Sequence, residues 1–137
     1  MKEAAAASPG VRLAVLIISG NPVGRRRLAY IGARTFEVVE ARHGNEAIVI
    51  LSTRSFDAVV LDLPLPRLRG VDVLAYYHGR YPGRSNVIVT GDPEQFPIIE
   101  SAAVYTMVAR PLDVDSFAAV LGECARGRTA RRVMERW

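Results

Sequence analysis

Five short apolar runs recur along the chain, with longer mixed segments between them. The runs cover residues 13–18, 36–39, 58–61, 87–89 and 104–108. They are mostly continuous rather than alternating, which is typical of strands that are covered on both faces. The pattern therefore predicts five buried strands, each followed by a helical segment.

Helix start signals stand between these runs. Asn21 is a good N-cap, and Pro22 after it suits the first helical position. Asn45 precedes a helical pattern over residues 46–51, and Gly70 precedes another over residues 71–77. Prolines 93 and 97 limit the segment after the fourth run, so the pattern predicts a short helix over residues 97–102 only.

The clearest helix is the last one, over residues 114–125. Val114, Phe117, Leu121 and Cys124 share one apolar stripe at helical spacing. Cys124 on this stripe is interpreted as a core residue and not as a reactive thiol. Strand and helix alternate five times, which predicts an α/β fold with a doubly wound, five-stranded parallel sheet.

Length and composition indicate one globular domain. The chain has 137 residues, of which 50% are hydrophobic and 23% charged. No apolar run reaches the length of a membrane span, and the only cysteine excludes an intrachain disulfide, so a cytoplasmic protein is expected. We expect a flexible leader over residues 1–10, the domain over 11–125 and a basic amphipathic extension over 126–137.

The net charge is +4 and comes almost wholly from arginine. The arginines are spread over residues 25–27, 67–69, 80–84 and the C-terminal segment, which fits a GC-rich genome better than one nucleic-acid surface. Nucleic-acid binding is the least favoured function. His43 and His78 have no partners at metal-ligand spacing, so no metal site is predicted and both are expected at helix edges.

Polar residues stand where the predicted strands end. Ser19 and Gly20 follow the first run, Asp62 the third, Thr90 the fourth and Arg110 the fifth. Because parallel strands end at one edge of the sheet, we expect these side chains to converge there. A carboxylate beside a hydroxyl and a cation is what phosphoryl chemistry on an aspartate requires.

These motifs resemble the receiver domain of bacterial response regulators, from about residue 11 to 125. The resemblance rests on four segments, which are residues 36–47, 61–70, 87–91 and 110–112. It implies a flavodoxin-like (βα)5 fold and a signalling module, not an enzyme, in two-component phosphorelay systems. It also implies that Asp62 is the phospho-acceptor position and Thr90 the switch threonine.

Three departures from the family stand at the site. The family's first strand ends in two acids that hold magnesium, and here these positions are Ser19 and Gly20. Arg110 replaces the family's lysine, and Met107 replaces the switch aromatic. Magnesium prefers carboxylate oxygens, so we expect weak or no magnesium binding. We also expect Arg110 to contact Asp62 in the resting protein.

Three functional hypotheses follow. The first is a stand-alone, atypical receiver that acts by protein–protein contact without magnesium. The alternative is a working phospho-receiver, in which Asp62 accepts phosphate from a histidine kinase or phosphotransfer protein. The third is a nucleic-acid-binding protein that uses its arginine-rich extension. A flavodoxin-like phosphate loop at residues 19–21 is disfavoured, because the expected hydroxyl residues and flavin-stacking aromatics are missing.

The partner surface is expected on the fourth helix, fifth strand and fifth helix. In the receiver family this face commonly carries partner or dimer contacts. Met107 suits an adaptable apolar contact there, and Trp137 in the extension is a typical interface anchor. The predicted partners are a sensor kinase, a phosphotransfer or effector protein, or a second copy of this chain.

Overall fold

A five-stranded parallel sheet forms the centre of the molecule. The computed structural model describes residues 12–99 and 103–127. The strands are ordered β2-β1-β3-β4-β5 across the sheet. Their bounds are β1 Ala14–Ser19, β2 Glu37–Ala41, β3 Ala58–Asp62, β4 Val87–Gly91 and β5 Thr106–Ala109. The doubly wound parallel sheet predicted from the apolar runs is confirmed.

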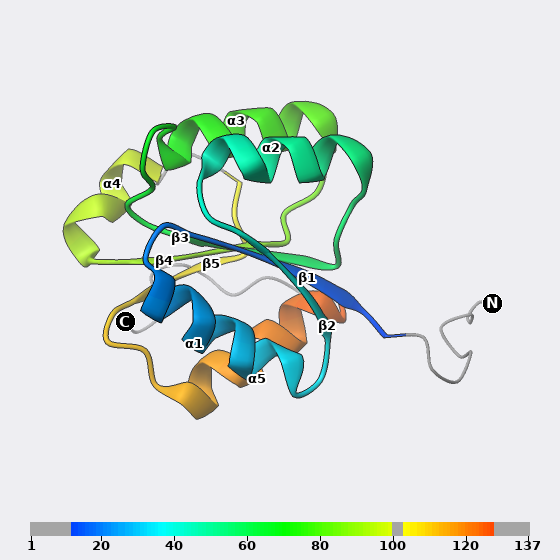
Figure 1. Ribbon diagram of the computed structural model, residues 1–137, viewed down its shortest axis with the longest axis vertical. Helices are drawn as coiled ribbons and strands as arrows, with labels where there is room; N and C mark the ends of the chain where they lie inside the picture. The colour runs from blue at the N-terminus through cyan, green and yellow to red at the C-terminus, as the bar shows by residue number, and fades with distance from the viewer. Residues whose placement is uncertain (1–11, 100–102, 128–137) are drawn as a thin grey trace.

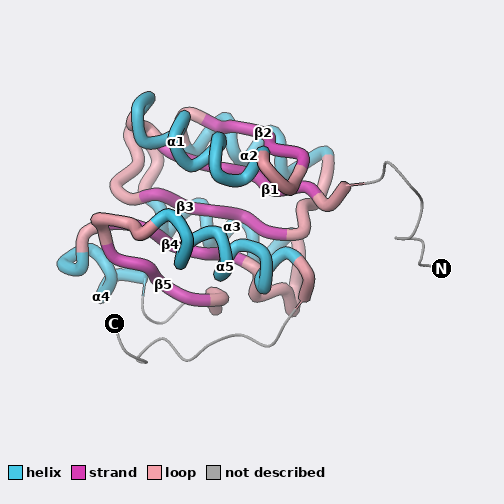
Figure 2. The backbone as a smooth tube through the Cα atoms, turned by 90° about the horizontal axis from the view of Figure 1, so that it is seen from below, coloured by secondary structure: helices cyan, strands magenta, loops and turns pink. Residues whose placement is uncertain are grey.

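Helices cover both faces of this sheet. In Figures 1 and 2, α1 and α5 lie on one face, and α2, α3 and α4 lie on the other. A short 3₁₀ turn, η2, precedes α4. Their bounds are α1 Pro22–Ala33, α2 Gly44–Thr53, α3 Gly70–Arg80, η2 Pro93–Gln95, α4 Phe96–Ile99 and α5 Val114–Ala125.

The two helical layers enclose separate apolar cores. All six residues of β1 are buried. Leu16 and Ile18 face one core, whereas Val15 and Ile17 face the other. Because successive side chains of a strand point to opposite faces, a continuous apolar run supplies both cores at once.

The helix starts follow local capping. The Asn21 side chain accepts hydrogen bonds from the amides of Val23 and Gly24, at 3.0 and 3.1 Å, which confirms the predicted cap of α1. The start of α2 differs from the prediction. It begins at Gly44 because the ring Nδ1 of His43 accepts the Glu46 amide at 3.2 Å and thereby acts as the N-cap.

The prediction for the helix after β4 is wrong at its start. Helical structure begins at Pro93 in η2 and continues into α4 at Phe96, ahead of the predicted start at Pro97. Pro93 lies in the first turn of η2, where its missing amide hydrogen would have no helical partner anyway, and it therefore begins the helical segment. Pro97 is the second residue of α4. The predicted end at residue 102 lies outside the described residues.

Met107 is buried, although its interpretation as a partner contact required it to lie on the surface. It is only 3% exposed and packs in the core on the α2, α3 and α4 side of the sheet. The thioether side chain is apolar, so burial stabilises it in this position. An exposed contact at this residue is thus excluded.

Several predictions on the ends of the chain are not covered by the structure. The expected leader over residues 1–10 and the extension beyond Gly127, with Trp137, lie outside the described residues. Among the residues that are described, no helix combines the length and apolar character that a membrane crossing needs.

Candidate functional site

The register of the parallel strands places the site residues side by side. Ser19 at the end of β1 is paired with Asp62 at the end of β3, and Asp62 is paired with Thr90 in β4. All three side chains are buried, with Asp62 only 7% exposed. The predicted convergence at the C-terminal edge of the sheet is confirmed for these residues.

The Asp62 carboxylate accepts three hydrogen bonds. Its Oδ2 accepts from the Ser19 hydroxyl at 2.8 Å. Its Oδ1 accepts from the Thr90 hydroxyl at 2.7 Å and from an Arg110 guanidinium nitrogen at 2.6 Å. Both oxygens of the carboxylate are therefore engaged, and the expected contact between Arg110 and Asp62 is confirmed.

Arg110 is held by more than this one carboxylate. A second guanidinium nitrogen donates to the Leu63 carbonyl at 2.7 Å. The Nε atom lies 3.5 Å from Oδ1 of Asp92, in an ion pair that the sequence analysis missed. Asp92 directly follows β4. Its position as an acid just beyond a strand end was the only feature of the sequence that indicated a role at this site. Because a guanidinium is planar and always charged, these partners hold Arg110 in one orientation.

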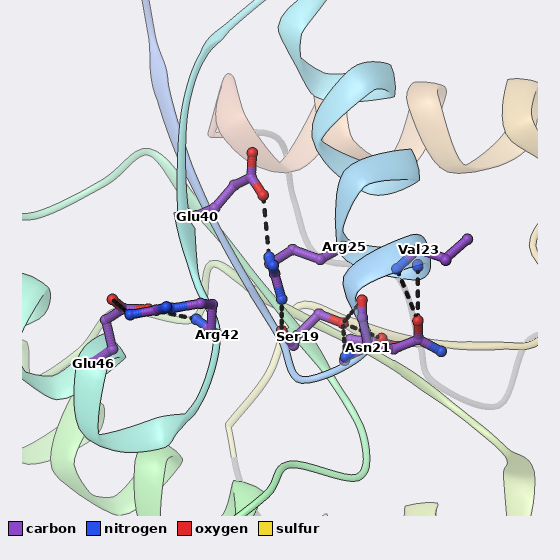
Figure 3. A network of polar contacts seen from close by, with 9 residues as sticks. Ser19, Asn21, Val23, Arg25, Glu40, Arg42 and Glu46 are labelled. Carbon is purple, nitrogen blue, oxygen red and sulfur yellow. Dashed lines mark hydrogen bonds and ion pairs between the residues drawn. The ribbon is translucent and has the colours of Figure 1, made fainter.

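A second arginine lies at the end of β1, as Figure 3 shows. Arg25 on α1 donates to the Ser19 carbonyl at 2.9 Å and to the Glu40 carboxylate at 3.2 Å. Its side chain is only 13% exposed. The sequence analysis also missed this contact, because it depends on how α1 packs against the ends of β1 and β2. A largely buried cation thus lies next to the C-terminal end of β1.

Gly20 has no room for a side chain. A Cβ atom built at this position would clash with the Pro66 ring, whose Cγ would lie 2.9 Å away. Real Cβ atoms essentially never approach another atom this closely. The loop between β3 and α3 therefore fills the space that an acidic side chain at residue 20 would need.

The oxygen atoms around Asp62 differ from the set that commonly holds magnesium in proteins. Asp62 is the only carboxylate at the ends of β1 and β3, and both of its oxygens already accept hydrogen bonds from the protein. Within residues 12–99 and 103–127, no group of three or more acid, histidine or cysteine side chains could hold a metal ion. Magnesium is usually held by one or two carboxylates that complete a near-octahedral shell with water, and the hydrogen bonds to both Asp62 oxygens compete with such coordination.

A cleft of about 520 Å³ opens beside Asp62 and Arg110. It lies between α1, the loop after β3, and the loop that joins β5 to α5. Its lining combines apolar side chains with a few polar ones, namely Asn21, Gly24, Arg27, Leu28, Ile31, Asp62, Leu63, Pro64, Asp92, Arg110, Pro111, Leu112 and Val114.

Cys124 and the two histidines have structural positions. Cys124 is 2% exposed in the core beneath α5, and burial raises the pKa of its thiol to about 12. His43 caps α2, and the His78 ring lies 2.7 Å from the Ala103 carbonyl. The predictions of a core cysteine and of helix-edge histidines are confirmed.

Comparison with known proteins identifies the family of the chain. The model of the response regulator receiver domain family matches residues 15–121. The chain belongs to this family. The receiver is also 29% identical over 124 residues to the transcriptional regulatory protein KdpE of Mycobacterium tuberculosis, in two strains. This match covers 88% of the receiver and 54% of KdpE, so the chain spans about half the length of these curated relatives.

Solved receiver structures share the fold at low sequence identity. A CheY-like receiver domain protein from Methanospirillum hungatei JF-1 is 18% identical with a TM-score of 0.76, covering 85% of this chain and 95% of that one. The receiver domain of an HD domain-containing protein from Pseudomonas fluorescens Pf-5 is 21% identical with a TM-score of 0.75. That match covers 85% of this chain and 96% of the other.

Proposed function

We propose that this receiver transmits a signal by protein–protein contact, without magnesium-dependent phosphorylation of Asp62. The chain is a receiver domain of two-component signalling, and this proposal concerns how the domain works. The observation that carries it is the closed environment of Asp62. Ser19, Thr90 and Arg110 donate to its two oxygens.

The physical argument concerns charge and access. Phosphoryl transfer to an aspartate brings several negative charges together, and metal ions normally offset them. Here the positions of the acidic pair are occupied by a hydroxyl, which binds Asp62, and by a glycine packed against Pro66. An incoming phosphoryl group would also have to displace Arg110 from Oδ1. The site thus has no acidic side chain at residues 19 and 20 to hold a metal ion, and both oxygens of the nucleophile, Asp62, already accept hydrogen bonds.

The surface proposed for a protein partner is the one formed by α4, β5 and α5. Support comes from the fixed arrangement beneath it. Met107 is buried under this surface and Thr90 is bound to Asp62, so neither side chain needs a phosphoryl group to take up its present position. A sensor kinase, a phosphotransfer or effector protein, or a second copy of this chain are the candidate partners. A cytoplasmic location also stays a prediction.

One observation favours the alternative of a working phospho-receiver. The cleft reaches Asp62, and a hydroxyl and a cation already lie within 2.7 Å of Oδ1. These groups could contact phosphoryl oxygens if Arg110 moved. Asp62 would then accept phosphate from a kinase or phosphotransfer protein.

Phosphorylation by acetyl phosphate separates the two hypotheses. The full chain is incubated with acetyl phosphate, with and without millimolar magnesium, and its intact mass is measured; Asp62→Asn is the matched control. We expect no added phosphoryl group in either protein. A magnesium-dependent addition that Asp62→Asn abolishes would overturn the proposal and establish the alternative.

A further inference from the structure

The cleft beside the site has the size and lining of a small-molecule pocket. Its volume of about 520 Å³ falls within the range of roughly 300 to 1,000 Å³ that is common for ligand pockets. Apolar side chains from α1 and from the segment after β5 form much of its wall, among them Leu28, Ile31, Leu112 and Val114. A ligand with an apolar body of several rings or branches fits this wall.

The two arginines that line the cleft differ in their ion-pair partners. Arg110 lies between Asp62 and Asp92 and is paired with both. Arg27 lines the same cleft, but its guanidinium has no hydrogen-bond or ion-pair partner within residues 12–99 and 103–127. The cleft therefore presents one cation that is free to bind an anionic group.

The position of Arg27 on α1 restricts the ligand further. Gly24, Arg27 and Ile31 recur at helical spacing and, with the N-cap residue Asn21, form one stripe of α1 along the cleft. The carboxylates of Asp62 and Asp92 line the same cleft, and they would repel a ligand with several negative charges. A ligand with a single anionic group can pair with Arg27 while limiting the repulsion from Asp62 and Asp92. Its apolar body would then lie against Leu28 and Ile31.

We propose that this cleft binds a small amphipathic monoanion, with an aromatic or branched apolar body and one carboxylate or sulfonate group held by Arg27. A guanidinium pairs well with planar carboxylates and also stacks on aromatic rings. The inference does not depend on how the receiver signals, because neither Arg27 nor the apolar wall contributes to the contacts of Asp62.

Anilinonaphthalene sulfonate is a suitable probe, because it joins one sulfonate to an aromatic body. We expect saturable fluorescence enhancement with the folded full chain in the absence of magnesium and phosphodonor. The neutral analogue N-phenylnaphthylamine lacks the sulfonate and should bind more weakly. In an amide-resolved NMR titration, the shifts should gather on α1 and on the segment from Leu112 to Val114.

Two pairs of variants locate the site. Arg27→Gln should weaken binding of the sulfonate dye roughly fivefold, whereas Arg26→Gln, one residue away and outside the lining, should leave it unchanged. Gly24→Phe should block the cleft, and Gly24→Ala should not. The backbone accepts a side chain there, since a Cβ at Gly24 would meet its nearest neighbour, the Asn21 Cγ, at 3.6 Å.

Each of four results would overturn the proposal. They are no saturable binding of the sulfonate dye, equal affinity for the neutral dye, equal effects of the Arg27 and Arg26 variants, and NMR shifts that gather away from the cleft. Circular dichroism of each variant confirms that it is folded. A failure here would leave the phosphorylation experiment unaffected, because that experiment measures Asp62 and contains no dye.

Discussion

At the scale of single residues, the character of the site depends on one carboxylate and its three donors. Asp62 is buried beside a cation and two hydroxyls. A buried charge is stabilised only when its hydrogen-bonding capacity is met, and each donor here meets part of it. Arg110 is the only charged donor among the three, so it is the counter-ion of this buried carboxylate.

Replacing Arg110 by alanine should therefore destabilise the fold. Asp62 would keep Ser19 and Thr90 but lose its counter-ion, at a cost of about 1 to 2 kcal/mol in the free energy of unfolding. Urea denaturation measures this change. Arg26→Ala is the matched control, because Arg26 is exposed and has no partner in the described part of the chain. Equal effects of the two substitutions would contradict the prediction.

The buried thiol of Cys124 gives a second prediction at this scale. Burial raises its pKa from 9.0 to about 12, and the thiolate is the reactive form. Native protein at about pH 8 should react with dithiobis(nitrobenzoate) far more slowly than the chain unfolded in urea. The stability that this group contributes is complete below pH 9.0 and declines as the pH rises towards about 12. Fast reaction of the native protein would show that α5 opens locally.

At the scale of elements, α1, α2 and α5 carry a side-chain cap, but α3 does not. Its N-cap residue is Arg69, which makes no capping hydrogen bond and instead pairs with Asp72 on the surface. Both side chains of this pair are well exposed, at 77% and 44%. Such a pair contributes less than a good N-cap does.

Arg69→Ser should consequently stabilise the domain. A serine hydroxyl can accept an amide of the first turn of α3, which is worth about 1 kcal/mol, less the small loss of the surface pair. Thermal unfolding followed by circular dichroism gives the change in Tm. Asn21→Ala, which removes the existing cap of α1, is the reciprocal control and should lower Tm by a similar amount. A lower Tm for Arg69→Ser would mean that the backbone before α3 cannot form the cap.

The sequence predicts elements better than it predicts their contacts. Continuous apolar runs mark the strands because parallel strands are buried on both faces, and strand ends locate Asp62, Thr90 and Arg110. The prolines before and within α4 led to a wrong predicted helix start. Proline breaks a helix interior but is also favoured in a first turn, and the sequence alone does not distinguish the two cases. The contacts of Arg25 and Asp92 carry no periodic signal, because they arise only when separate elements pack together.

At the scale of the whole molecule, packing between two distant segments determines which side chains fit at residue 20. The loop after β3 places Pro66 against Gly20, at the end of β1. Restoring an acid at residue 20 alone would therefore push this loop away from the sheet. An acidic side chain at residue 20 thus also requires a change at Pro66, which is far from it in the sequence.

This coupling leads to a prediction on magnesium. Any ligand that binds only the folded state raises its stability by RT ln(1 + [L]/Kd), so Tm reports binding. The natural chain should show no change of Tm in millimolar magnesium. A variant with Ser19→Asp, Gly20→Asp, Pro66→Ala and Arg110→Lys should gain about 1 kcal/mol or more once magnesium exceeds its Kd several-fold. The same variant with Pro66 retained is the control and should be less stable and respond less, because the ring still occupies the space of the new carboxylate. Stabilisation of the natural chain by magnesium would show that Asp62 exchanges Arg110 for the metal, and the closed site would then be only one of its states.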